Sequence, residues 1–102
     1  MKVFWTKFAL ASLKDIYTYY NKNVSTIIAR KIRDNIFQCT WQLEKHPLTG
    51  AIEEHLEDLQ EGHRFILRGN YKIIYKIQQK KIFVTDIFDT RQNPEKIKQR
   101  NK

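Results

Sequence analysis

Three β-prone segments with very short connections constrain the fold of this chain more than any other feature. They span residues 63–68, 71–78 and 81–89, and only Gly69-Asn70 and Gln79-Lys80 lie between them. Short connections join neighbouring strands antiparallel, whereas parallel strands need a crossover of a dozen or more residues. The C-terminal half is therefore predicted to form an antiparallel meander.

Two amphipathic helices are predicted before the meander. Thr6 and Ser25 are expected to cap them, because a hydroxyl at this position accepts a hydrogen bond from a free backbone N–H. Apolar residues recur at three-and-four spacing behind each cap. They are Ala9, Leu10, Leu13, Ile16, Tyr17 and Tyr20 in the first helix, and Ile28, Ala29, Ile32, Ile36, Phe37 and Leu43 in the second.

With a short strand at residues 2–5, the predicted fold is α+β in the order β-α-α-β-β-β. A helical hairpin would pack on a small antiparallel sheet. The segment from His46 to Gly50 contains breaker residues, and the acidic stretch to Gly62 is expected to be a loop with one helical turn.

The length favours one domain over residues 1–102, with 41% apolar and 13% aromatic residues to build one core. The basic segment after Thr90 is expected to become a mobile tail from about residue 95.

The chain shows neither a run of 18 apolar residues nor a signal-peptide core, so we expect a soluble, cytoplasmic protein without membrane contacts. Cys39, the single cysteine, is expected to be a buried apolar residue.

The formal net charge of +8 is unevenly distributed along the chain. Five of the eleven acidic residues fall between Glu53 and Glu61, a stretch without Lys or Arg. The remaining surface favours a polyanion, which is RNA, DNA or an acidic protein. A lysine-rich surface that serves only solubility is the alternative, and charge does not choose between these readings.

Alternation along the second β segment places Tyr71 and Tyr75 toward the helices and Lys72 and Lys76 on the opposite face. A two-residue turn at Gly69-Asn70 would put two arginines of the preceding strand on the apolar side, where unpaired guanidinium groups are costly. We therefore predict a loop one residue longer, which sends both arginines to the lysine face. Ile87 is expected opposite Lys72, with Arg91 at even spacing from it. The predicted open basic face holds Arg64, Arg68, Lys72, Lys76 and Arg91.

The three histidines, His46, His55 and His63, lack the spacing of a metal site or of a nucleophile partner. Each is expected to be an ordinary loop or surface residue. His63 remains a candidate for proton transfer, because it begins the strand that carries Arg64. No metal or cofactor is expected.

Taken with this element order, several segments resemble the RelE/ParE toxins of type II toxin–antitoxin systems. They are His46-Pro47-Leu48-Thr49-Gly50, Arg64, Asn70-Tyr71-Lys72-Ile73-Ile74-Tyr75 and Asp89-Thr90-Arg91, and the resemblance covers nearly the whole chain. Membership implies a plasmid-stabilisation type of module, in which a cognate antitoxin wraps the toxin and silences it.

The resemblance implies one of two activities. RelE-like members cut messenger RNA on the ribosome with basic residues and a C-terminal acid–base residue. Lys72 matches the strand position that is commonly arginine, Arg91 matches the terminal arginine, and Arg64 matches an earlier basic position. Ile97 stands where the terminal tyrosine is expected. ParE-like members lack the nuclease set and are associated with poisoning DNA gyrase.

The favoured hypothesis is a growth-inhibiting toxin with DNA gyrase as its target, in which the basic surface makes the contact. The alternative is a ribosome-dependent mRNA endoribonuclease. Arg64, Lys72 and Arg91 would then stabilise the scissile phosphate, and His63 or a ribosomal group would transfer the proton. A third reading is a basic nucleic-acid-binding domain without toxicity.

Overall fold

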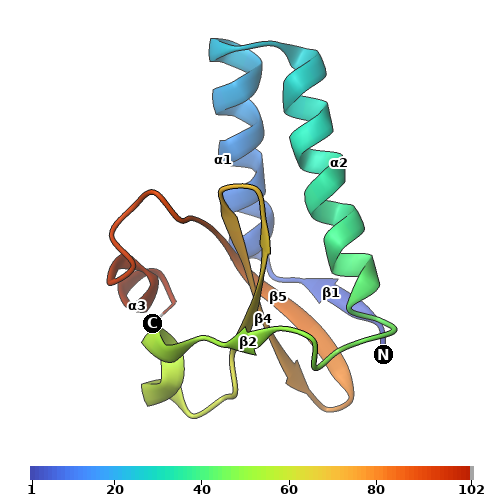
Figure 1. Ribbon diagram of the computed structural model, residues 1–102, viewed down its shortest axis with the longest axis vertical. Helices are drawn as coiled ribbons and strands as arrows, with labels where there is room; N and C mark the ends of the chain where they lie inside the picture. Colours follow the sequence, from blue (N-terminus) through green and yellow to red (C-terminus); the bar gives the residue numbers. More distant parts are fainter. Residues whose placement is uncertain (102) are drawn as a thin grey trace.

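A helical hairpin and a five-stranded sheet form the body of the molecule in the computed structural model, which describes residues 1–101 (Figure 1). The predicted α+β class and helical hairpin are confirmed. The elements are β1 (Val3–Trp5), α1 (Lys7–Asn23), α2 (Thr26–Gln42), β2 (Ala51–Ile52), the 3-10 helix η1 (Glu54–Leu59), β3 (Arg64–Arg68), β4 (Tyr71–Gln78), β5 (Lys81–Asp89) and α3 (Lys96–Arg100).

Both helices of the hairpin begin at the predicted caps. The Thr6 hydroxyl accepts a hydrogen bond from the Ala9 N–H at 3.1 Å, and the Ser25 hydroxyl accepts one from the Ile28 N–H at 3.1 Å. Each bond satisfies one of the N–H groups that a helix leaves free in its first turn.

The strand order in the sheet is β1-β5-β4-β3-β2. The meander β3-β4-β5 is antiparallel as predicted, and β2 adds a two-residue strand to the edge at β3. The first strand pairs parallel to β5, with Phe4 beside Phe83. Such pairing is available because α1 and α2 supply the long connection that a parallel neighbour needs.

The predicted register of the β3–β4 hairpin is wrong. The turn has two residues, with Gly69 in the left-handed region at φ 57°, so Arg68 pairs with Tyr71 and Arg64 pairs with Tyr75. Both arginines therefore lie on the helix face, the side of the sheet that carries Tyr75 and the α1–α2 hairpin. The desolvation cost that argued against this register does not arise, because Arg68 is exposed and Arg64 is only half-buried.

A β-bulge changes the register of the second hairpin. Ile74 pairs with Asp86 while Tyr75 pairs with Val84, which leaves Thr85 as an extra residue in β5. Bulges of this kind shift every later pair by one residue.

The bulge overturns the predicted partner of Lys72 in β5. This residue lies opposite Phe88, and Ile87 pairs with Ile73 on the helix face. Arg91 follows Ile87 at even spacing and lies beside α1, so it does not share a face with Lys72.

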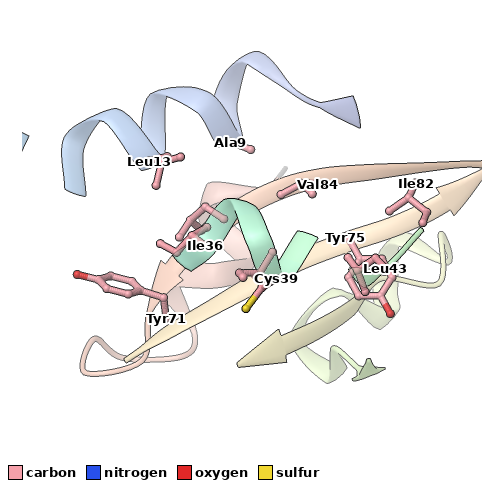
Figure 2. Close-up of a cluster of buried hydrophobic side chains, with 11 residues drawn as sticks. Ala9, Leu13, Ile36, Cys39, Leu43, Tyr71, Tyr75, Ile82 and Val84 are labelled. Carbon is pink, nitrogen blue, oxygen red and sulfur yellow. The ribbon is translucent and has the colours of Figure 1, made fainter. Parts of the chain in front are cut away.

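The main core lies between the helical hairpin and the helix face of the sheet (Figure 2). Ala9 and Leu13 of α1 approach from one side, and Ile36 of α2 packs with them over the strands. The remaining buried members are Cys39, Leu43, Tyr71, Ile73, Tyr75, Ile82, Val84 and Ile87. Burial of Cys39 confirms its expected role.

A second, smaller core lies on the opposite side of the sheet, which we call the outer face. Leu56 of η1 and Ile97 of α3 cover Ile74 and Phe88, with Phe65 packed against them. The prediction of a mobile tail from about residue 95 is wrong, because residues 96–100 form a helix whose Ile97 is fully buried. An apolar side chain at this position anchors the basic segment.

Between residues 1 and 101, no helix combines the length and apolar character needed to cross a membrane.

Candidate functional site

Lys72 lies on the outer face as predicted, but its part of this face is not open. Its Nζ donates to Glu53 Oε2 at 2.9 Å and lies 4.1 Å from the centre of the Phe65 ring. Only 1% of Glu53 is exposed. Burial alone would raise the pKa of Glu53, but hydrogen bonds from Lys72 and His55 outweigh it and hold that pKa below its usual value. Lys72 therefore balances a buried carboxylate.

The acidic stretch 53–61 folds back onto the outer face and neutralises two of its lysines. Lys76 forms an ion pair with Glu61, as Lys72 does with Glu53, and hydrogen bonding to Lys76 lowers the pKa of Glu61. The same stretch reaches α3, where Asp58 accepts from Lys98 Nζ at 2.7 Å. The predicted open basic face is therefore wrong, because the acidic stretch does not form a separate loop but pairs with Lys72 and Lys76.

Arg64 holds the Pro-Leu-Thr-Gly loop in place. Its Nη1 donates to the Gly50 carbonyl at 2.8 Å. The Tyr75 hydroxyl donates to the Pro47 carbonyl at 2.8 Å and accepts from the Gly50 N–H at 2.9 Å. Three of the segments that carried the family resemblance thus meet in one structural clamp between the loop and the sheet.

Arg68 borders a small groove between the helical hairpin and the β3–β4 turn. The groove is lined on the other side by Tyr20, Ile32 and Ile36. Within the described chain, Arg68 has neither a hydrogen bond nor an ion pair from its side chain, which leaves its guanidinium available to a partner.

His63 is buried and faces the charged outer side of the sheet, with 5% of its surface exposed. Among residues 1–101, its Nδ1 has no hydrogen-bond partner. Burial lowers the pKa of His63, and the nearby Lys76 lowers it further against the opposing charges of Glu61 and Glu53. The structure therefore keeps this histidine away from solvent.

Arg91 lines a groove that runs between α1 and the end of β5. Its guanidinium makes two hydrogen bonds to Asp89, at 3.0 and 2.8 Å, and these lower the pKa of Asp89. The groove has a volume of about 440 Å³, and Tyr19, Asp15 and Arg100 also line it. Two acidic and two basic side chains face this space, so it carries no strong net charge.

The structure thus disperses the predicted nuclease residues. Arg64 and Arg91 are on the helix side, Lys72 is on the outer face, and His63 is buried. Each of the three basic residues has a partner within the chain.

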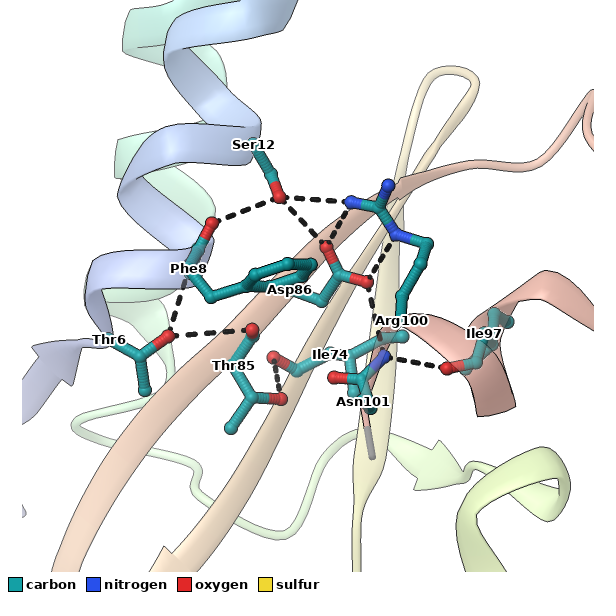
Figure 3. A network of polar contacts seen from close by, with 10 residues as sticks. Thr6, Phe8, Ser12, Ile74, Thr85, Asp86, Ile97, Arg100 and Asn101 are labelled. Atoms are coloured by element: carbon teal, nitrogen blue, oxygen red, sulfur yellow. Dashed lines mark hydrogen bonds and ion pairs between the residues drawn. The ribbon is translucent and has the colours of Figure 1, made fainter.

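A buried charge network escaped the sequence analysis (Figure 3). Asp86 is fully buried, and Arg100 holds its two oxygens through Nε at 3.0 Å and Nη2 at 2.8 Å. The Ser12 hydroxyl donates to Asp86 Oδ1 at 3.1 Å, and the Asn101 side chain donates to Oδ2 at 3.2 Å. The sequence signal for this network is Asp86, an acidic residue in the middle of an apolar strand, because a buried carboxylate requires a partner.

Comparison with known proteins identifies the family. A family model described as the ParE toxin of the type II toxin-antitoxin system parDE matches residues 3–94. The chain belongs to the ParE toxin family. The search of curated proteins found no match.

The fold agrees with that membership. A chain of the chromosomal ParDE TA system from P. aeruginosa is similar to this one with a TM-score of 0.72 and 22% sequence identity. The similarity covers 87% of this chain and 95% of that chain. The predicted RelE/ParE resemblance is therefore confirmed at the level of family and fold.

The ParE match contains most of the candidate site but ends before α3. Arg64, Lys72 and Arg91 lie inside the matched residues 3–94, whereas Arg100 lies beyond them. The ion pair between Arg100 and Asp86 therefore joins a strand of the matched ParE region to a helix outside it.

Proposed function

We propose that this ParE-family chain is the growth-inhibiting toxin of a type II toxin–antitoxin module and that it acts in the cytoplasm on DNA gyrase. A cognate antitoxin would bind the toxin and silence it. The family match supports the module, and one structural observation favours gyrase over messenger RNA. That observation is the separation of the candidate nuclease residues onto different sides of the sheet.

Cleavage of a phosphodiester requires several groups within hydrogen-bond reach of one phosphate, including one that transfers a proton near neutral pH. Lys72 and Arg91 already have carboxylate partners, and Arg64 donates to a backbone carbonyl. His63, the remaining candidate for proton transfer, is 5% exposed. This arrangement favours action by binding.

The antitoxin would need apolar side chains and carboxylates in one segment. Apolar surface is available at Ile27, Trp41 and Leu67, which are 79%, 61% and 59% exposed. The guanidinium of Arg68 could pair with a carboxylate of the antitoxin. Amphipathic segments with acidic groups recognise such surfaces.

Induction of the chain in bacteria tests the proposal. Growth should stop, and co-expression of the cognate antitoxin should restore it. Messenger RNA ends mapped within minutes of induction should be unchanged from those of uninduced cells, while DNA breaks bound to gyrase should accumulate.

New cuts inside translated codons would instead establish the ribosome-dependent endoribonuclease. Normal growth with the intact, soluble chain would refute the toxin assignment itself. The two results separate an error about the target from an error about the activity.

A further inference from the structure

One end of the outer face lies beyond the elements that cover the rest. The helices η1 and α3 cover the part around Ile74 and Phe88. In Figure 1, α3 lies at one side of the sheet, whereas β1 and the β4–β5 turn lie at the other. The outer-face side chains at this second end belong to β1 and to the adjoining parts of β4 and β5.

Strand register arranges these side chains in two rows. The parallel β1–β5 pairing puts Phe4 beside Phe83, and the backbone bond from Ile82 N–H to the Lys2 carbonyl brings Lys2 next to Lys81. Residues two apart on a strand share a face. With the β4 partners added, the rows are Lys2, Lys81 and Gln78 in one, and Phe4, Phe83 and Lys76 in the other. We call these six residues the aromatic–lysine array.

The array presents aromatic rings and cations to solvent. Phe4 is 41% exposed and stacks on Phe83, with ring centres 5.9 Å apart and planes inclined by 30°. The Nζ of Lys81 lies 5.6 Å from the centre of the Phe4 ring. Within residues 1–101, neither Lys2 nor Lys81 forms an ion pair. Of the acids near the array, Glu61 is paired with Lys76, and the Glu44 carboxylate accepts a hydrogen bond from the Val3 N–H at 3.0 Å.

We propose that the aromatic–lysine array binds a single-stranded polynucleotide. Unpaired bases stack on exposed aromatic rings, and lysines track the adjacent phosphates, which is the chemistry of the two rows. A duplex fits less well, because its bases are stacked on one another and their faces are not free to stack on Phe4 or Phe83. The inference rests on this surface alone and does not depend on gyrase being the target.

Fluorescence anisotropy with the purified full-length chain tests this site. The probes are labelled oligothymidylate and oligouridylate of about 12 nucleotides, within the length that one small domain contacts. The wild-type chain should bind both, with affinity falling steeply between about 50 and 200 mM salt. The probe that binds with the higher affinity shows whether the natural strand is DNA or RNA.

Variants locate the binding on the array. Phe4→Leu keeps an apolar side chain but removes the ring, and should weaken binding at least about fivefold. Lys2→Ala combined with Lys81→Ala should reduce the salt slope by about 1.4, because each lost phosphate contact removes about 0.7. Thermal unfolding of each variant verifies that the fold is retained.

Matched controls remove the same chemistry elsewhere on the surface. Tyr19→Leu removes a ring that is 58% exposed outside the array, and Lys22→Ala combined with Lys31→Ala removes two positive charges from the helical hairpin. These variants should bind much as the wild type does. Equal weakening by array and control variants would overturn the proposal, since it would indicate attraction by net charge alone.

Two other results would also overturn it. One is the absence of binding to either oligonucleotide at low salt. The other is self-association of the chain that Phe4→Leu abolishes, which would show that a second copy covers the array.

Discussion

Removal of the Arg100 guanidinium should destabilise the fold far more than an ordinary surface change. Arg100→Met keeps much of the aliphatic stem over the rings of Phe8 and Phe88 but leaves Asp86 with Ser12 and Asn101 as its remaining donors. Breaking a fully buried ion pair costs about 3–5 kcal/mol. The Arg100 side chain is 32% exposed and Asp86 is fully buried, so we expect a loss of roughly 3 kcal/mol, at the lower end of that range.

Urea unfolding followed by circular dichroism measures this loss. Arg91→Met is the matched control, because it breaks a pair whose side chains are 58% and 22% exposed, and it should change the stability far less than Arg100→Met does. Adding Asp86→Asn to Arg100→Met removes the uncompensated charge, so the double variant should recover a large part of the stability.

A loss for Arg100→Met no larger than that of the control would refute the reasoning. So would a double variant less stable than the single one. Either result would mean that the buried carboxylate does not depend on the C-terminal helix.

Three further outcomes follow from the structure. Gly50→Ala should cost about 1–3 kcal/mol in thermal or urea unfolding, because its Cβ would lie 2.6 Å from Tyr75 Oη; unchanged stability would contradict the clamp. Lys72→Met should lower the free energy of unfolding by about 2 kcal/mol, since Glu53 loses a charged hydrogen bond, whereas a purely catalytic lysine would leave it unchanged. The pKa of His63 is lowered by burial, so the unfolded chain binds a proton before the folded chain does, and urea midpoints should fall as the pH drops below 6.5. His63→Leu should remove this pH dependence of the urea midpoint. If the dependence persists in the variant, other titrating groups cause it.

The sequence predicted the elements because their signals are local. Thr6 and Ser25 cap the helices as expected, and both helices follow the three-and-four spacing of their apolar residues. The three meander strands lie within a residue of their predicted limits. Local propensity and side-chain period are enough for such features.

The candidate site was harder to predict, because it depends on register and on contacts between distant segments. One extra residue at Thr85 moved the partner of Lys72, and the two-residue turn before Tyr71 placed Arg64 and Arg68 on the helix face. A bulge leaves no clear mark in the pattern of apolar residues, so the pattern alone supports either register.

Ion pairing across long stretches of chain was also beyond the sequence pattern. Glu53 reaches Lys72 and Asp86 reaches Arg100, and both carboxylates are buried. The acids were visible in the sequence, but their partners become identifiable only when the acidic stretch and α3 are placed on the outer face. The charge that suggested an open binding surface is in part used to stabilise the fold.

Incubation of the purified chain with DNA gyrase and supercoiled plasmid is the most direct test of the proposed target. The account predicts that double-strand breaks linked to gyrase accumulate, and that the cognate antitoxin prevents them. Plasmid without such breaks, together with cleavage of messenger RNA on programmed ribosomes by the same preparation, would contradict it.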